Sequence, residues 1–114
     1  MSNIKWYLLD DNNIPYEETD LIKVNNFFES PKRITKQEYP IPNNETVSVS
    51  TVFLALDHNI SFNNEKDKLP ILWETMVFGG EFDGYQKRYT SHKDALKGHK
   101  LIVSKIKRNA QATN

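Results

Sequence analysis

A segment at residues 69–89 combines the strongest strand pattern in the chain with the only closely spaced glycines. Residues 71, 73, 75 and 77 would lie on one face of a strand, and residues 72, 74, 76 and 78 on the other. Both sets are largely apolar. Such a strand is typical of the middle of a sheet that is covered on both sides. The pattern therefore predicts a central strand at 71–78, a glycine-containing turn at 79–84 and a short return strand at 85–89.

Apolar residues at strand spacing predict three further strands, at 5–10, 33–39 and 46–56. The second and third are joined by a segment rich in proline and asparagine, so we expect them to form a hairpin. The third strand is the longest, and one of its sides carries Val47, Val49, Thr51, Phe53 and Ala55.

Apolar residues at helical spacing predict two helices. The first covers 21–29 and begins after Asp20, a residue type favoured as a helix N-cap. The second begins after Ser91, and Asp94 three positions later gives a variant of the capping box. Gly98 lies inside this second helix, where it costs up to ~1 kcal/mol relative to alanine, and we expect it to allow close packing on the sheet.

The order strand, helix, hairpin, strand, short strand, helix predicts an α+β fold. We expect a mainly antiparallel sheet of four to five strands, with a short helix after the first strand and the C-terminal helix packed on the sheet. A chain of 114 residues is long enough for one domain with its own core. We assign this domain to residues 1–108 and expect residues 109–114 to form a frayed tail.

The composition excludes several kinds of chemistry. The absence of cysteine rules out disulfides, thiolate catalysis and zinc sites with cysteine ligands, and it fits a reducing compartment. No apolar run approaches the ~20 residues of a membrane-spanning helix, and we see no signal-peptide pattern. Residues 1–85 carry 7 basic and 14 acidic side chains, whereas residues 86–114 carry 8 and 1. This asymmetry predicts a basic helix lying on an acidic sheet or, alternatively, a basic face for nucleic acid or phosphate.

The chain lacks a Walker-type loop, a nucleotide-binding glycine fingerprint and a Gly-x-Ser-x-Gly motif. An acid–base or metal site would need the strand ends and the C-terminal helix to bring together Asp57, His58, Glu74 and His99. In the alternative, structural interpretation, His99 is a hydrogen-bonded core residue and Asp57 and His58 cap a strand end. Glu74 then lies at a solvated edge or pairs with a lysine or arginine. We expect no cofactor and no metal.

The turn before the return strand is the predicted contact surface. Phe82 and Tyr85 lie at this turn, in a chain whose aromatic residues outnumber the needs of a small core. Aromatic side chains anchor interfaces well because they bury much area at little entropic cost. Charges of both signs lie nearby, at Asp83, Lys87 and Arg88, which suits specific docking better than non-specific DNA binding. The rival interpretation is an ordinary hairpin turn with Phe82 folded onto the core.

Three segments resemble a family of small proteins encoded by bacteriophages and prophages: VSTVFLALDHNI (49–60), PILWETMVFGG (70–80) and RYTSHKDALKGHKLIV (88–103). In that family a strand ending in Leu-Asp-His, a Glu-Thr-Met-Val-Phe-Gly-Gly strand and an Ala-x-x-Gly-His helix recur in this order. The likeness covers nearly the whole chain, although Trp73 stands where phenylalanine is more usual and the polar loop at 61–68 is extended. The resemblance implies a phage accessory protein in the host bacterial cytoplasm, and it carries over no catalytic residue.

These features favour a binding protein over an enzyme. We expect a phage-encoded accessory protein that inhibits a host protein, such as a defence protein, or that sequesters a small nucleotide signal. The alternative is a regulatory or virion-associated protein that contacts DNA through the basic C-terminal helix. No membrane partner is expected.

Overall fold

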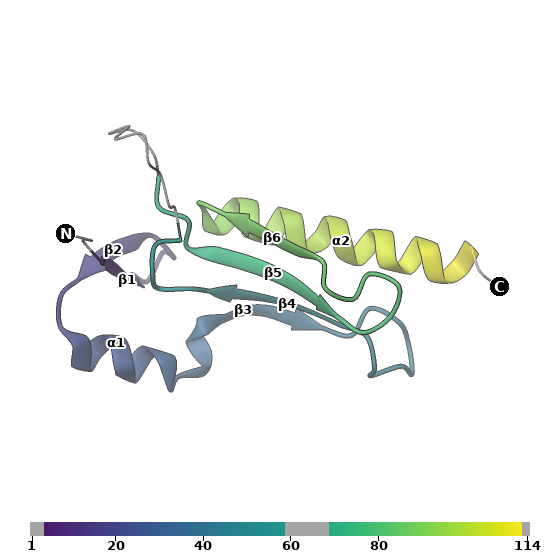
Figure 1. The fold of residues 1–114 in the computed structure, drawn as a ribbon, viewed down its shortest axis with the longest axis horizontal. Helices are drawn as coiled ribbons and strands as arrows, with labels where there is room; N and C mark the ends of the chain where they lie inside the picture. Colours follow the sequence, from purple (N-terminus) through teal and green to yellow (C-terminus); the bar gives the residue numbers. More distant parts are fainter. Residues whose placement is uncertain (1–3, 59–68, 113–114) are drawn as a thin grey trace.

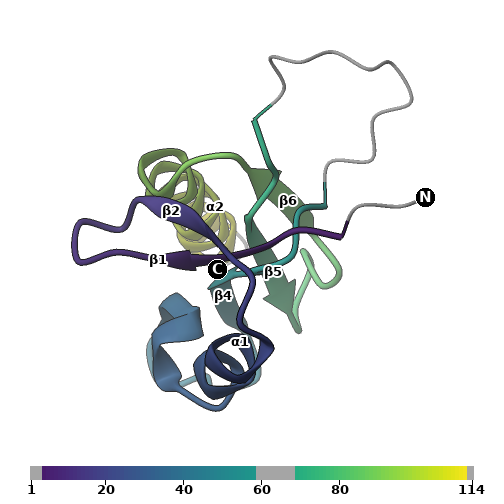
Figure 2. The same ribbon diagram turned by 90° about the vertical axis from the view of Figure 1, so that its left-hand side faces the viewer.

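The computed structural model describes residues 4–58 and 69–112 of the chain, which form two layers (Figure 1). A four-stranded antiparallel sheet, in the order β3-β4-β5-β6, forms one layer, and helix α2 lies across it as the other. A two-stranded sheet, β1-β2, and helix α1 lie at one end of the larger sheet (Figure 2). The bounds are β1 Trp6–Leu9, β2 Pro15–Glu18, α1 Leu21–Phe28, β3 Ile34–Glu38, β4 Ser48–Phe53, β5 Trp73–Phe78, β6 Gln86–Tyr89 and α2 His92–Ala112, with a 3-10 turn, η1, at Pro31–Arg33.

The predicted α+β class is confirmed, with a correction at the N-terminal end. The strand predicted at 5–10 forms β1, but the chain then turns back into β2, so the short helix follows the second strand rather than the first. The Asp10 carboxylate closes this turn by accepting hydrogen bonds from the backbone N–H groups of Asn12 and Ile14 at 2.8 and 2.9 Å. The sequence of β2, Pro-Tyr-Glu-Glu, has no apolar alternation, which is why the pattern does not predict it.

Both predicted helix N-caps are confirmed. Asp20 Oδ1 accepts the N–H of Ile22 at 2.9 Å, and Ser91 Oγ accepts the N–H of Asp94 at 3.1 Å. These bonds satisfy N–H groups that have no partner within the first helical turn. α2 remains helical beyond Arg108, where the sequence predicts the start of a frayed tail. Within the described residues, no helix combines the length and the apolar character needed to cross a bilayer.

The core lies between α2 and the face of the sheet that it covers. β4 and β5 direct alternate side chains toward the helix, and their register places Val49 opposite Val77, Thr51 opposite Thr75, and Phe53 opposite Trp73. None of these side chains is more than 2% exposed. They meet the buried stripe of α2, which consists of Ala95, His99, Ile102, Val103 and Ile106. The side of the 46–56 strand predicted as one face is therefore the buried one.

β5 occupies the central position predicted for it, because it pairs with β4 on one side and β6 on the other. The expectation that both of its faces are covered holds at Glu74, which is 8% exposed, but fails toward the end of the strand, where Met76 is only partly buried and Phe78 is 49% exposed. α2 covers the face that carries Trp73, and α1 packs on β1, β2 and η1 (Figure 1). Neither described helix covers the second face. The sequence pattern does not predict this, because apolar character alone does not specify which face of a strand receives a helix.

Candidate functional site

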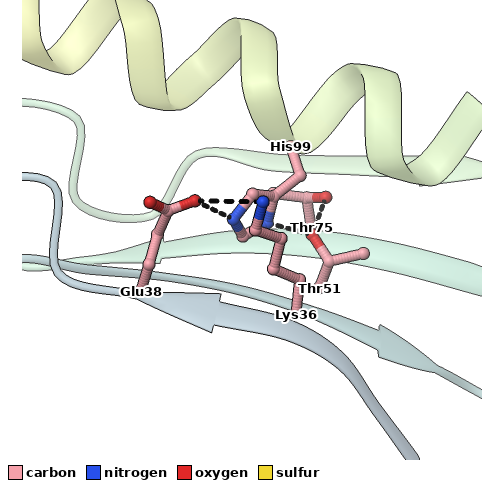
Figure 3. A network of polar contacts seen from close by, with 5 residues as sticks. All are labelled: Lys36, Glu38, Thr51, Thr75 and His99. Carbon is pink, nitrogen blue, oxygen red and sulfur yellow. Dashed lines mark hydrogen bonds and ion pairs between the residues drawn. The ribbon is translucent and has the colours of Figure 1, made fainter.

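A chain of polar side chains runs through the core beneath α2 (Figure 3). Thr75 on β5 and Thr51 on β4 have hydroxyl oxygens 2.5 Å apart. Thr51 Oγ1 lies 2.7 Å from Nδ1 of His99 on α2, whose other ring nitrogen, Nε2, lies 2.8 Å from Glu38 Oε1 on β3. Lys36 Nζ approaches the same carboxylate oxygen at 4.0 Å. The chain thus connects a buried hydroxyl with a partly exposed carboxylate on an edge strand.

The proton positions along this chain follow from what each group can donate. A carboxylate only accepts, so His99 donates from Nε2 to Glu38. The neutral ring then accepts at Nδ1 from the Thr51 hydroxyl, which in turn accepts from Thr75. Burial, the largest influence, lowers the pKa of His99 below its usual value, while the hydrogen bond and the charge of Glu38 act in the opposite direction. The neutral imidazole of His99 is therefore the favoured state, and it fixes the direction of the hydrogen bonds in this network.

This row of hydrogen-bonded side chains has the properties of a structural network. Thr51, Thr75 and His99 are 0% exposed, so a ligand cannot reach them in this arrangement of the fold. The interpretation of His99 as a hydrogen-bonded core residue is confirmed. Two buried atoms on the same face, Trp73 Nε1 and Tyr89 Oη, have no hydrogen-bond partner among the described residues. Burial raises the pKa of the Tyr89 hydroxyl. Thr75 lies near enough to oppose this rise, but it forms no hydrogen bond with the Tyr89 Oη atom.

A second polar cluster, on the opposite face of the sheet, is centred on Glu74. Its Oε2 accepts hydrogen bonds from two residues of β6, from Gln86 Nε2 at 2.5 Å and from Arg88 Nε at 2.8 Å. Burial, the largest influence, raises the pKa of the Glu74 carboxyl. The hydrogen bonds from Arg88 and Gln86, with the charges of Arg88 and His58, outweigh this effect and lower the pKa below its usual range. The pairing of Glu74 with a basic residue, predicted as its structural role, is confirmed.

We call the side of the four-stranded sheet opposite α2 the open face. The strand register places apolar and polar residues on it together: Ile34, Ser48, Ser50, Val52, Glu74, Met76, Phe78, Gln86 and Arg88. Phe78 is 49% exposed, Ile34 is 39% exposed, and 44% of the Arg88 side chain is exposed. The open face therefore presents apolar area around an ion pair.

The structure does not bring together Asp57, His58, Glu74 and His99, as an acid–base or metal site would need. Glu74 points to the open face, whereas the next residue of β5, Thr75, points to the network of His99 beneath α2. Successive strand residues point to opposite faces, so the sheet itself separates the carboxylate from the imidazole. Within the described residues, no group of three or more histidine or acidic side chains is placed to hold a metal ion.

Asp57 and His58 hold the chain just beyond the end of β4 at Phe53, which agrees with their structural interpretation as residues that cap a strand end. Asp57 Oδ1 accepts the N–H of Ile71 at 2.9 Å, just before β5 begins. His58 Nδ1 donates to the carbonyl oxygen of Leu56 at 2.6 Å, and its own backbone N–H donates to the carbonyl of Ile71 at 3.0 Å. The imidazole is near enough for its charge to lower the pKa of Glu74, so His58 belongs to the surroundings of the open face.

The turn at 79–84 packs onto the core. Phe82 and Tyr85 are partly buried against the apolar cluster beneath α2. The Asp83 carboxylate accepts the N–H of Gly79 at 2.7 Å and so closes the turn. The rival interpretation, a hairpin turn with Phe82 folded onto the core, is therefore confirmed, and a contact surface at this turn stays a prediction.

The predicted contact residues are only partly brought together. Arg88 meets Glu74 on the open face, whereas Lys87 alternates with it and lies on the α2 side of β6, opposite Thr75. The sequence interpretation did not include Thr51, Thr75, Glu38 or Gln86 among the functional positions. A signal for two of them was present, because a threonine inside an apolar strand face needs a hydrogen-bond partner.

By fold, the chain is an α+β protein with one long helix on a four-stranded antiparallel sheet. No protein-family model, no curated protein and no solved structure matches it. Its function is therefore inferred from its residues and their geometry.

Proposed function

We propose that the protein is a bacteriophage-encoded accessory protein that works by binding a host protein in the bacterial cytoplasm, not by turnover, and that the open face is its contact surface. The observation that carries this proposal is the exposure of Phe78 on the same uncovered sheet face as the half-exposed Arg88. The phage setting is supported by the resemblance of its three sequence segments to phage and prophage proteins.

The residue types on the open face are those that protein interfaces favour. Phenylalanine, methionine and arginine are enriched at interfaces, and a few such residues supply most of the binding energy. Phe78 and Met76 provide apolar area, while Arg88 uses Nε to bind Glu74. No described residue pairs with the terminal nitrogens of Arg88, and such nitrogens can bind a carboxylate or carbonyl oxygen of a partner.

The Glu74 carboxylate makes this arginine suitable for recognition. A guanidinium that is already held at Nε loses less side-chain freedom on binding than a freely rotating one. A face of a β-sheet is also broad, whereas small nucleotides are held in concave sites. The open face therefore favours a protein partner over a nucleotide signal, with an acidic or carbonyl acceptor beside an apolar patch.

The proposal is tested by capture of host proteins with the wild type and with two matched variants. Phe78→Asp places a charge on the open face, and Ile22→Asp places the same charge at an exposed apolar position on α1. Captured proteins are identified by quantitative mass spectrometry, and the affinity of the purified partner is then measured by titration. We expect Phe78→Asp to weaken binding by tenfold or more, about 1.4 kcal/mol, and Ile22→Asp to leave it unchanged.

Circular dichroism and a urea midpoint for each variant establish that the fold is retained. Equal binding by the wild type and Phe78→Asp would contradict the open face as the contact surface. Steady release of a modified small molecule by the purified protein would contradict the proposal that it works by binding alone.

A further inference from the structure

The outer face of α2 carries a straight stripe of cations. Lys93, Lys97, Lys100, Lys107 and Arg108 fall within one sector of the helix and are all exposed. The stripe extends over about 22 Å at 1.5 Å per residue. α2 packs on β3, β4, β5 and β6 (Figure 1), so by helical spacing the stripe lies on the side of the helix away from the sheet. We call these five residues the α2 stripe.

The α2 stripe has no ion-pair partner among the described residues. None of its five cations forms an ion pair with a described carboxylate, and the one acidic residue of the helix, Asp94, lies in its first turn. Lys93 and Lys97 are four residues apart, and Lys97 and Lys100 are three apart, spacings at which like charges repel and weaken a helix. The partial cancellation expected between a basic helix and an acidic sheet therefore does not take the form of ion pairs to the α2 stripe among the described residues.

We infer that the α2 stripe binds the phosphate backbone of duplex DNA without reading its sequence. A duplex carries one negative charge per roughly 1.7 Å of its axis, so a stripe of this length lies beside many phosphates and needs no bend in either partner. Lysine binds phosphate as a point charge, and phosphate contacts carry no sequence information. Adenine edges are read by asparagine or glutamine, which the α2 stripe lacks, and planar, bidentate recognition suits arginine better than lysine. Four of the five cations are lysines, which favours backbone contact over base recognition.

Other anionic partners fit the α2 stripe less well. Single-stranded nucleic acid is normally bound by stacking its bases on aromatic side chains, and the exposed large apolar residues of α2 are Leu96 and Leu101. An acidic protein helix would bury these two leucines together with the charges. The contribution of Leu101, which is 58% exposed, therefore separates an acidic protein from DNA.

Fluorescence anisotropy with a short duplex of random sequence tests the inference at several salt concentrations. If about four phosphates are contacted, the slope of log K against log salt is roughly −3 to −4, which weakens binding about 100-fold between 50 and 200 mM salt. The matching single strand is measured in parallel, and we expect it to bind at least several-fold more weakly than the duplex.

Two triple variants with the same change of net charge identify the surface. Lys97→Gln/Lys100→Gln/Arg108→Gln removes the centre and one end of the α2 stripe, and Lys5→Gln/Lys23→Gln/Lys32→Gln removes three exposed cations elsewhere. We expect the first to reduce the salt slope by about 2 to 3 and to weaken binding at low salt by tenfold or more. We expect the second to leave both nearly unchanged.

Three results would overturn the inference: equal effects of the two triple variants, stronger binding to the single strand, or a loss of DNA binding with Leu101→Ser as large as that with the triple α2 variant. Circular dichroism of each variant verifies that α2 is retained. The Phe78→Asp variant should bind the duplex normally, so failure of the open-face proposal and failure of this inference are distinguishable.

Discussion

Gly98 on α2 lies directly against Tyr89 at the end of β6. A Cβ atom at position 98 would stand 2.1 Å from the Tyr89 hydroxyl oxygen and 2.4 Å from its ring carbons, where real Cβ atoms essentially never come within 3.0 Å. The helix approaches the sheet this closely only because residue 98 has no side chain. The close packing predicted for this glycine from the sequence is therefore confirmed.

We expect Gly98→Ala to destabilise the fold, although alanine favours a helix over glycine by about 1 kcal/mol. The clash must be relieved by moving buried Tyr89 or α2, and overpacking of this kind costs about 1–3 kcal/mol. The midpoint of urea unfolding measures the result, with Ser104→Ala on the exposed side of the same helix as control. A midpoint for Gly98→Ala above that of the wild type would contradict the packing account.

Tyr89→Phe removes a buried hydroxyl that has no hydrogen-bond partner in the described part of the chain. We expect this change to leave the free energy of unfolding unchanged or to raise it by up to about 1 kcal/mol. It should also recover part of the loss in Gly98→Ala, since the hydroxyl oxygen is the atom nearest to the new methyl group. If Tyr89→Phe alone lowers stability by more than about 1 kcal/mol, the hydroxyl is hydrogen-bonded to Thr75 after all.

Local signals in the sequence predicted most of the larger sheet and both helices. Asp20 and Ser91 mark helix starts because their side chains accept N–H groups of the first turn, an interaction that needs only neighbouring residues. The hairpin of β3 and β4 and the central place of β5 follow from apolar alternation and turn residues. β2 is held mainly by backbone pairing with β1, so its side chains give no comparable signal.

The candidate sites depend on tertiary neighbours, which a single sequence does not specify. Glu74 needed a partner, but only the register of β5 and β6 shows that this partner is Arg88. His99 was expected to be hydrogen-bonded, yet its two partners come from β3 and β4, 61 and 48 residues away along the chain. Glu74 and His99 do not come together, because a one-residue step along β5 changes the face of the sheet.

Trp73→Ala should lower the free energy of unfolding by about 3–5 kcal/mol, the usual cost of emptying a large buried site. Trp73 is 0% exposed, and its ring lies 5.1 Å from that of Phe53 and 6.2 Å from that of His92, centroid to centroid. Trp73→Phe is the matched control and should cost less than half as much, because the indole N–H it removes has no partner among the described residues. A loss below about 1 kcal/mol for Trp73→Ala, read from the urea midpoint, would show that this site is not part of the core.

The lowered pKa of His99 predicts how stability depends on pH. The unfolded chain takes up a proton at this side chain near its ordinary pKa of about 6.5, whereas the folded chain resists protonation until the pH is lower. The contribution of His99 is therefore fully present above about pH 6.5 and is lost as the pH falls through the folded pKa. Urea midpoints at about pH 7.5 and pH 5.5 measure this loss.

His99→Gln tests the assignment, because it removes the titrating group and keeps a side chain with both a donor and an acceptor. We expect this variant to be less stable at neutral pH but to lose less stability between pH 7.5 and 5.5. Glu74 also has a lowered pKa, but its contribution is lost only below its ordinary value near 4.5, so the two effects occupy separate pH ranges. An unchanged pH dependence in His99→Gln would show that another group titrates.

The unequal burial of Glu74 and Arg88 predicts unequal costs for breaking their ion pair. The Glu74 side chain is 11% exposed, whereas that of Arg88 is 44% exposed. Arg88→Ala leaves a nearly buried carboxylate with Gln86 as its one remaining partner among the described residues, which should cost about 1–3 kcal/mol. Glu74→Gln leaves a guanidinium that water can still reach, so it should cost less, within about 1 kcal/mol.

The pH dependence of Arg88→Ala provides a second measurement of the same asymmetry. In the wild type, the lowered pKa of Glu74 gives stability above about pH 4.5 that is lost as the pH falls through the folded pKa. Without the guanidinium, the effect of burial is to raise the pKa of this carboxyl, so Arg88→Ala should lose less stability than the wild type on acidification, or gain some. Glu74→Gln has no carboxyl at this position, so position 74 should contribute no change of stability with pH. Urea midpoints at about pH 7 and pH 4 distinguish the variants. Equal destabilisation by both substitutions at neutral pH would contradict the unequal burial of Glu74 and Arg88. It would also mean that the ion pair does not hold Arg88 in place on the open face.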